Sequence, residues 1–242
     1  MSTPGPIAPR PSVAVIMPVL NEADGLEASV RALDGFDLHE IVIVDGGSSD
    51  ATRAVAARLA GAADRAVPVR VVQSVAGRAH QMNRGARGTS ADVLLFLHAD
   101  TTLPSGALDS VRAALRKGRT WGRFDVRLDG RQVMFRMIER MMNLRSALTG
   151  IATGDQAMFV LRDTFTLLGG FAPLPLMEDV ELSRRLKWTG APAILHAPVV
   201  TSARRWRVGG LWRTVLRMWT LRLLYSLGVS PARLAGHYRP VR

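Results

Sequence analysis

Residues 12–22 read SVAVIMPVLNE and residues 40–50 read EIVIVDGGSSD. In each stretch a run of β-branched and other apolar residues ends abruptly in a polar turn. A continuous apolar run, without the polar alternation of a half-exposed strand, is typical of strands buried on both faces of a parallel sheet. We therefore predict parallel strands at residues 12–18 and 40–45, with polar side chains at their carboxyl ends.

Segments with helical periodicity alternate with these strands. Between the first two strands, Leu26, Val30 and Leu33 recur at the spacing of one helix face. Four such alternations in succession favour right-handed βαβ units and an α/β fold with a mostly parallel central sheet flanked by helices. The predicted helices cover residues 22–35, residues 49–59 and a segment that begins at Gly77, and the further strands cover residues 69–73 and 92–98.

The second part of the chain has a less regular order of elements. Its predicted helices cover residues 107–116, 132–148, 178–188 and 209–227, and its predicted strands cover residues 121–128, 156–161, 193–196 and 199–203. Arginines interrupt every apolar stretch, so none is long enough for a transmembrane span. We expect a flexible tail at residues 1–11, a single α/β domain at residues 12–206, and a basic amphipathic helix and tail at residues 207–242.

The composition limits the chemistry of the protein. With 242 residues, 48% of them apolar, the chain is long enough for one substantial core. It contains no cysteine, which excludes disulfides, thiolate nucleophiles and cysteine-ligated zinc. The first residues lack the basic and apolar regions of a signal peptide, and we therefore expect a cytoplasmic protein.

The net charge is strongly positive. The chain has 32 Lys and Arg residues against 20 Asp and Glu residues, which gives a formal charge of +12. This charge favours anionic partners such as nucleotides or an anionic membrane surface, although a coding bias toward arginine would raise it equally. A nucleic-acid-binding protein would show a basic stripe with interleaved aromatic residues. The sequence has only two tyrosines and predicts no nucleic-acid partner.

Polar residues follow three of the predicted strands at the point where each strand ends. They lie at residues 18–22, 45–50 and 98–101. Taken singly, Glu22 or Asp50 could cap a helix, and the two glycines after Asp45 could simply make a turn. Ligands of open α/β sheets bind outside the carboxyl ends of the strands. The three segments together therefore predict a ligand site at this edge of the sheet.

Seven short segments, in this order, resemble motifs of glycosyltransferase family 2, which has the GT-A fold. They are PVLNE at residues 18–22, VDGGSSD at 44–50, GRAHQMN at 77–83, LHADT at 97–101, GDQ at 154–156, MEDVEL at 177–182 and RRW at 204–206. The chain looks most similar to the small bacterial subgroup named transferase 2, rSAM/selenodomain-associated, also called arsenosugar-biosynthesis glycosyltransferases. The resemblance covers residues 12–206 and implies a nucleoside-diphosphate sugar as the donor.

The resemblance places the donor site at several strand ends. Asp45 would accept a hydrogen bond from the base edge, and Arg78 would face the nucleotide or its phosphates. Asp45 could instead cap the turn that follows it, and Arg78 could be a solvated helix residue. The implied donor-binding residues are Pro18, Val19, Leu20, Asn21, Glu22, Asp45, Gly77, Arg78, His98, Ala99 and Arg205.

The segment LHADT occupies the place of the family's DxD metal motif. Asp100 matches the last acidic position and is an oxygen ligand suited to Mg²⁺ or Mn²⁺, so the resemblance implies a divalent cation. His98 stands at the first acidic position and departs from the motif. Its imidazole could bind Mn²⁺, donate to the ribose or fill space beneath the nucleotide.

Transfer with inversion requires a carboxylate that removes the acceptor proton as the anomeric carbon gains oxocarbenium character. By resemblance Asp179 is this base, Glu178 is its neighbour, and Asp155 lies across the cleft near the acceptor. The acidic cluster that begins at Glu178 would also suit the first turn of a helix, where it meets the positive end of the helix dipole.

The acceptor side of the expected site is less defined. The resemblance places Gly154, Gln156 and Trp206 there. In the QxxRW motif of processive relatives a glutamine stands where this chain has Ser202, and this departure disfavours processive polymer synthesis. Trp206 could stack against a sugar or a lipid, or it could pack in the core.

Two predicted helices, residues 132–148 and 209–227, carry apolar stripes beside several arginines. Such helices can lie in an anionic membrane surface, with Met-rich faces adapting to varied apolar ligands. They can equally pack on the core or form the interface of a homodimer. The stripe of the second helix consists of Trp212, Leu216, Trp219, Leu223 and Leu227.

We therefore expect an inverting, metal-dependent glycosyltransferase that acts on a small or lipid-like acceptor. The departure at His98 keeps open a catalytically inactive protein that only binds sugar nucleotides. A nucleotidyltransferase is disfavoured, because it would need a Gly-rich GxGxR loop after the first strand, where this chain reads PVLNEADG.

Overall fold

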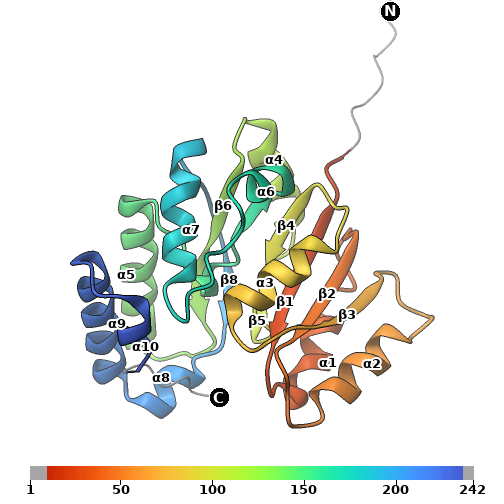
Figure 1. The fold of residues 1–242 in the computed structure, drawn as a ribbon, viewed down its shortest axis with the longest axis horizontal. Helices are drawn as coiled ribbons and strands as arrows, with labels where there is room; N and C mark the ends of the chain where they lie inside the picture. Colours follow the sequence, from red (N-terminus) through yellow and green to blue (C-terminus); the bar gives the residue numbers. More distant parts are fainter. Residues whose placement is uncertain (1–9, 237–242) are drawn as a thin grey trace, which may run out of the picture.

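The computed structural model describes residues 10–236, apart from the side chains of Arg205, Val208, Leu211 and Trp212. Within this range the chain forms an eight-stranded sheet flanked by helices, in the strand order β3-β2-β1-β4-β7-β6-β8-β5 (Figure 1). The predicted α/β class is confirmed. The sheet is mixed, because its second half contains antiparallel pairs.

The first half of the sheet is parallel, as the apolar runs predict. Its strands are β1 (Val13–Val19), β2 (Glu40–Asp45), β3 (Val69–Gln73) and β4 (Val93–Phe96). Ile16 of β1 pairs with Val42 on one side and with Phe96 on the other. All four strands therefore end at the same edge of the sheet.

Helices cover both faces of the sheet, and the alternation of side chains along β1 fixes the two layers. Val13, Val15 and Met17 pack against α1 (Ala23–Arg31), α2 (Thr52–Ala60) and α4 (Ala107–Arg116). Ile16 points the other way and packs against α3 (Arg78–Arg87), α6 (Arg162–Leu167) and α7 (Glu178–Leu186). The loops at the carboxyl edge thus lie between two helical layers.

The second half of the sheet joins the first through a short strand. β7 (Phe159–Leu161) lies antiparallel between β4 and β6 (Trp121–Leu128). β8 (Ala193–Thr201) runs parallel to β6, and β5 (Thr101–Thr102) pairs antiparallel with β8. The remaining elements are α5 (Val133–Thr149), the 3-10 turns η1 (Gly154–Gln156) and η2 (Lys187–Thr189), α8 (Arg204–Gly209), α9 (Leu211–Ser226) and α10 (Pro231–Ala235).

Two strand predictions were wrong at their boundaries. The two strands predicted at residues 193–196 and 199–203 are the single strand β8, which passes Pro198 at a shift in its pairing with β6. A bulge tolerates proline because the extra residues make no ladder hydrogen bond. The strand predicted at residues 156–161 begins only at Phe159, because Thr153 and Gln156 form a capping box that turns the preceding residues into η1.

The helix predicted at residues 209–227 is α9, which begins two residues later, at Leu211. Gly210 has φ 73°, a left-handed conformation that glycine adopts without strain, and it separates α8 from α9. The short elements β5, α6, α8 and α10 were not predicted. Their two to six residues are too few to show a period.

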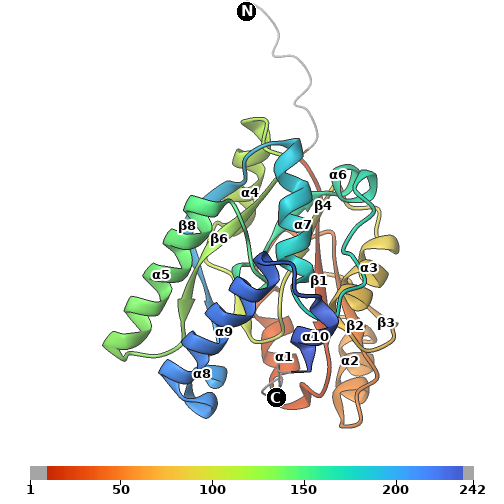
Figure 2. The ribbon, with the colours of Figure 1, turned by 60° about the vertical axis from the view of Figure 1, so that its left-hand side comes forward.

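Helix α9 lies beside α5, on the side of the molecule away from β3 (Figure 2). Val215 near its start packs against Phe135 and Ile138 of α5, and Leu221 further along packs against Met177 and Val180 at the start of α7. Within the described residues, no helix is both long and apolar enough to cross a membrane.

Candidate active site

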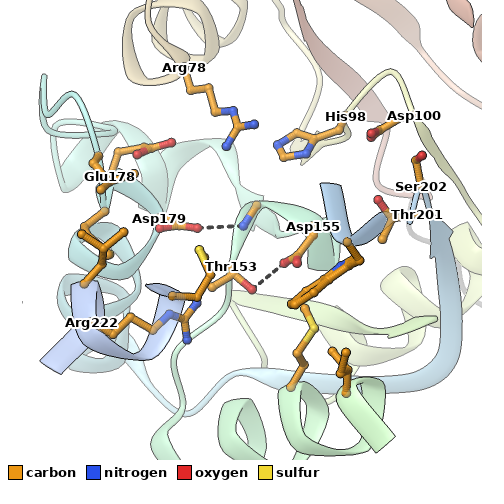
Figure 3. Close-up of a pocket in the computed structure, with 18 of the residues that line it drawn as sticks. Arg78, His98, Asp100, Thr153, Asp155, Glu178, Asp179, Thr201, Ser202 and Arg222 are labelled. Atoms are coloured by element: carbon orange, nitrogen blue, oxygen red, sulfur yellow. Dashed lines mark hydrogen bonds between the residues drawn. The ribbon is translucent and has the colours of Figure 1, made fainter. Parts of the chain in front are cut away.

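A cavity of about 1180 Å³ opens at the carboxyl edge of the sheet. Its walls come from the ends of β1 and β4, the first turns of α3 and α7, and the facing sides of α5 and α9 (Figure 3). Most of the predicted site residues line it, namely Pro18, Val19, Leu20, Glu22, Gly77, Arg78, His98, Ala99, Asp100, Gly154, Asp155, Glu178, Asp179 and Trp206.

Helix α3 is anchored to the strand ends by a buried glutamine. Gln81 Nε2 donates to the carbonyl oxygens of Val19 and Val44, both at 2.8 Å. A Cβ atom on Gly46 would lie 2.9 Å from the Gln81 side chain, so a glycine is needed where the β2 turn passes α3. These contacts fix the first turn of α3, and with it Arg78, at the rim of the cavity.

Asp45 and Asn21 hold the turns of this edge. The Asp45 carboxylate is buried and accepts from the backbone N–H groups of Gly47 and Ser48 at 3.1 to 3.2 Å. Asn21 has φ 54° and accepts from the Ser49 N–H at 2.9 Å. Neither side chain lines the cavity. The turn-capping alternative for Asp45 is therefore what the structure displays, and its contact with a base stays a prediction.

At the cavity wall, Glu22 forms an ion pair with a residue from the later part of the chain. Arg204 Nη2, at the start of α8, lies 3.3 Å from Glu22 Oε1. Both residues line the cavity, as does Trp206. The side chain of Arg205, predicted to bind the donor, lies outside the described part of the molecule.

His98, Gly154 and Asp179 all line the cavity, and Figure 3 shows the His98 and Asp179 side chains reaching into it. Asp179 Oδ2 accepts from the Gly154 N–H at 2.8 Å. A Cβ atom on Gly154 would lie 2.9 Å from His98 Nε2 and 3.9 Å from Asp179 Oδ2. The absence of a side chain at residue 154 thus leaves room for the imidazole and keeps the space next to the carboxylate open. The departure at His98 places an imidazole beside Gly154, whose N–H donates to the predicted base.

Glu178 is the most perturbed carboxyl group of the site. It is 7% exposed, and burial together with the adjacent Asp179 carboxylate raises the pKa of Glu178 from 4.5 to about 7, while Arg78 opposes the shift. Near neutral pH the pair of neighbouring carboxyls can therefore hold a proton at Glu178. The Asp179 side chain beside it accepts from the Gly154 N–H.

The GDQ segment divides between a cavity role and a structural role. Asp155 lines the cavity, and its Oδ1 accepts from Thr153 Oγ1 at 2.5 Å. Gln156 is fully buried and does not line the cavity, and its Oε1 accepts from the Thr153 N–H at 3.1 Å. Gln156 makes a capping bond that shapes the loop holding Gly154, and its acceptor contact stays a prediction.

Two arginines of the cavity were missed by the sequence analysis. Arg145 of α5 and Arg222 of α9 both line it, and Arg222 projects from α9 below Thr153 (Figure 3). Burial and the Arg222 charge lower the pKa of Arg145 to about 10, while the charges of Asp155 and Asp179 oppose the shift. The only available signal was weak, because each arginine merely stands three or four residues after apolar residues that also line the cavity.

The other half of the cavity is apolar. Six large side chains of α5 and α9 line it while remaining between 37 and 77% exposed, namely Met141, Leu144, Leu148, Leu216, Trp219 and Leu223. The predicted stripe of the last helix is therefore not a core face, since Leu227 is also 71% exposed. The Trp212 side chain lies outside the described residues.

A comparison with known protein families shows which family the sequence belongs to. Over residues 14–168, more than half of the chain, the sequence matches the family described as Glycosyl transferase family 2. The chain belongs to glycosyltransferase family 2. The narrower subgroup suggested by the motifs stays a prediction. A comparison with curated protein sequences gave no significant match.

Solved glycosyltransferases share the fold of this family 2 member. The mannosyltransferase PcManGT from Pyrobaculum calidifontis, in complex with GDP-Man and Mn²⁺, aligns with a TM-score of 0.68 at 20% identity, over 97% of this chain and 72% of the other. TarS 1–349 from S. aureus in complex with UDP-GlcNAc aligns with a TM-score of 0.61 at 16% identity, over 79% of this chain and 58% of the other. TarS 1–349 alone aligns with a TM-score of 0.64 at 16% identity, over 92% of this chain and 68% of the other.

The residues of this glycosyltransferase fit a metal site that is completed by substrate phosphates better than a site formed by protein side chains alone. Among residues 10–236, three or more Asp, Glu or His side chains do not come together in any group that could hold an ion. The Asp100 carboxylate is exposed at the cavity beside Thr101, whose Oγ1 donates to it at 3.4 Å. Mg²⁺ is commonly bound by one or two carboxylates together with substrate phosphates. Asp100 suits that arrangement.

Proposed function

We propose that the protein transfers a sugar from a nucleoside-diphosphate sugar to an acceptor hydroxyl with inversion at the anomeric carbon. The observation that carries the proposal is the convergence of Asp179, His98 and Gly154 in the cavity at the carboxyl edge of the sheet. A carboxylate that is fixed by a backbone N–H and faces an open cavity has the position of a general base. The membership of family 2 supports the reaction class.

Asp179 is the proposed base. Its carboxylate takes the proton of the acceptor hydroxyl while the new C–O bond forms, and the bond from the anomeric carbon to the diphosphate breaks, so that the nucleoside diphosphate leaves with the bonding electrons. The Gly154 N–H fixes the direction of the carboxylate. A proton held on Glu178 removes the repulsion that a second carboxylate charge would add.

The donor is proposed to lie between Arg78 and the ends of β1 and β4. Arg78 projects into the cavity from the first turn of α3 (Figure 3), where a guanidinium suits the oxygens of a diphosphate. Asp100 would hold Mg²⁺ or Mn²⁺ together with the diphosphate, and the bound cation would stabilise the charge of the leaving group. His98 lies between this region and Asp179, close to where the sugar would sit.

A product assay tests the proposal. The protein is incubated with a panel of nucleoside-diphosphate sugars, Mn²⁺ or Mg²⁺ and candidate acceptors, and the released nucleoside diphosphate is measured. Asp179→Asn should lower turnover by about 10² or more, because a general base contributes about that much in typical enzymes. Donor affinity measured by calorimetry should stay close to that of the wild type.

Asp163→Asn is the matched control for this substitution. Its side chain is 91% exposed on α6, outside the cavity, and its removal should leave turnover unchanged. Turnover of Asp179→Asn near the wild-type value would move the base to Asp155, the next carboxylate in the cavity. Donor binding without turnover under all conditions would instead identify a protein that binds sugar nucleotides without catalysis.

A further inference from the structure

The cavity is larger and more apolar than a sugar nucleotide alone requires. Its volume of about 1180 Å³ exceeds the range of roughly 300 to 1,000 Å³ typical of small-molecule sites. Beyond the carboxylates it continues between α5 and α9, where the six exposed lining residues named above form an apolar rim. Ile138, Met142, Val215 and Leu221 line the same part of the cavity from inside.

A contiguous exposed apolar surface of this kind usually marks a binding site. A core role is excluded for the rim, because Leu144, Leu148 and Leu216 are each at least 60% exposed. The rim is also continuous with the catalytic region, since a single cavity joins Trp219 to Asp179. Its occupant would therefore have its apolar part next to the reacting centre.

A pair of positive charges lies in this continuous cavity. Arg145 belongs to α5, Arg222 belongs to α9, both line the cavity, and the Arg222 charge acts on Arg145. Among residues 10–236, neither guanidinium lies within salt-bridge distance of a carboxylate. Asp155 and Asp179 act on Arg145 only at longer range. Two guanidinium groups in a partly buried cavity form a site for an anionic group.

We infer that the acceptor is a single-chain anionic amphiphile, whose anionic group lies between Arg145 and Arg222 and whose alkyl chain lies along the apolar rim between α5 and α9. This inference rests on the glycosyl transfer proposed above. The acceptor hydroxyl lies beside the anionic group, because Arg145 and the proposed base Asp179 line the same cavity. The charge of the arginine pair selects an anion rather than a neutral lipid.

The chain length of the ligand gives a quantitative signature. A fully buried methylene contributes about 0.8 kcal/mol, which corresponds to about a fourfold gain in affinity. The rim residues stay partly exposed, so each methylene should contribute less, about two- to fourfold. A site that recognised only the anionic group would show no gain at all.

The experiment is calorimetric binding to the full chain without any donor. The probes are hexyl, octyl and decyl phosphate below their critical micelle concentrations, with inorganic phosphate and octanol as the two halves of the ligand. Octyl phosphate should bind at least about tenfold more tightly than either half, since the charge-assisted and apolar contributions combine. Affinity should rise from hexyl to decyl phosphate.

Arg222→Gln and Arg213→Gln form a matched pair on α9. Arg222 lines the cavity, whereas Arg213 is exposed outside it. Arg222→Gln should weaken octyl phosphate at least about fivefold and leave octanol binding unchanged, because only a charge-assisted contact is lost. Arg213→Gln should change neither. A second pair, Leu223→Ser in the rim and Leu227→Ser outside it, should differ in the dependence on chain length.

Three results would overturn the inference. The first is an affinity for the alkyl phosphates that does not change with the length of the alkyl chain, or that Arg222→Gln and Arg213→Gln lower equally. The second is binding to anionic phosphatidylglycerol vesicles without binding to monomeric decyl phosphate, which would make the rim a membrane-docking surface. The third is a concentration-dependent dimer, seen by light scattering, that excludes decyl phosphate. Nucleoside diphosphate release is measured separately, so a failure of glycosyl transfer and a failure of amphiphile binding remain distinguishable.

Discussion

Replacing Glu178 with glutamine should change how the stability of the protein depends on pH. The side chain is buried at the start of α7, where burial and the neighbouring Asp179 raise its pKa from 4.5 to about 7. Between these two values the unfolded chain has released a proton that the folded chain keeps. The free energy of unfolding therefore falls as the pH rises through this window.

The size of the effect follows from the shift. The interval between 4.5 and about 7, at about 1.4 kcal/mol for each pH unit, corresponds to a total loss of about 3 kcal/mol. Between pH 5 and pH 8.5, which contains most of the window, the expected loss is about 2 to 3 kcal/mol. Glutamine has the same size and does not ionise, so Glu178→Gln should gain this amount over the wild type from pH 5 to pH 8.5.

Urea unfolding of both proteins at the two pH values measures the difference. Glu40→Gln is the control, because Arg70 helps to hold the pKa of Glu40 below 4.5 against the opposing effect of burial. Glu40 is ionised in both states throughout this range, and its replacement should destabilise by the same amount at both pH values. If Glu178→Gln also showed no pH-dependent difference, Glu178 would be ionised in the folded protein and the argument from burial would be refuted.

Two further variants test the centre of the cavity and the proposed metal ligand. Gly154→Ala would place a methyl group 2.9 Å from His98 Nε2. We expect this variant to lose about 1 to 3 kcal/mol of stability and to have at least about tenfold lower turnover. The control is Gly25→Ala in α1, where the added methyl group would meet no atom within 4 Å, and its turnover should be unchanged. Equal losses in both variants would contradict the proposed contact. Asp100→Asn should abolish the gain in donor affinity that Mn²⁺ gives, measured by calorimetry, and a wild type whose donor affinity ignores Mn²⁺ would contradict the shared metal site.

The first half of the fold could be predicted because its signals are local. The apolar runs at residues 13–17 and 41–44 are typical of strands buried on both faces of a sheet, and both are fully buried strands in the structure. The polar segments at their ends then had to meet at the same edge. His98, Asp100 and Arg78 do line a common cavity, as the strand order required.

The second half could not be predicted with the same accuracy because its order depends on contacts between distant segments. A strand was predicted at residues 156–161, but its sequence does not indicate that it pairs antiparallel between β4 and β6. Arg145 and Arg222 looked like solvated arginines of amphipathic helices. Their role in the cavity emerges only when α9 is packed beside α5.

The ion pair between Glu22 and Arg204 links residues 182 positions apart, and α9 completes the cavity from still further along the chain. During translation, the strands of the first half can pair as soon as β4 has left the ribosome, because β1, β2 and β3 precede it. The cavity, in contrast, cannot close until residue 226 has emerged. A nascent chain arrested between these two points would have the parallel core of the enzyme, while Asp179 and the apolar surfaces of α5 lay open to water, and such exposure makes a folding intermediate prone to aggregation.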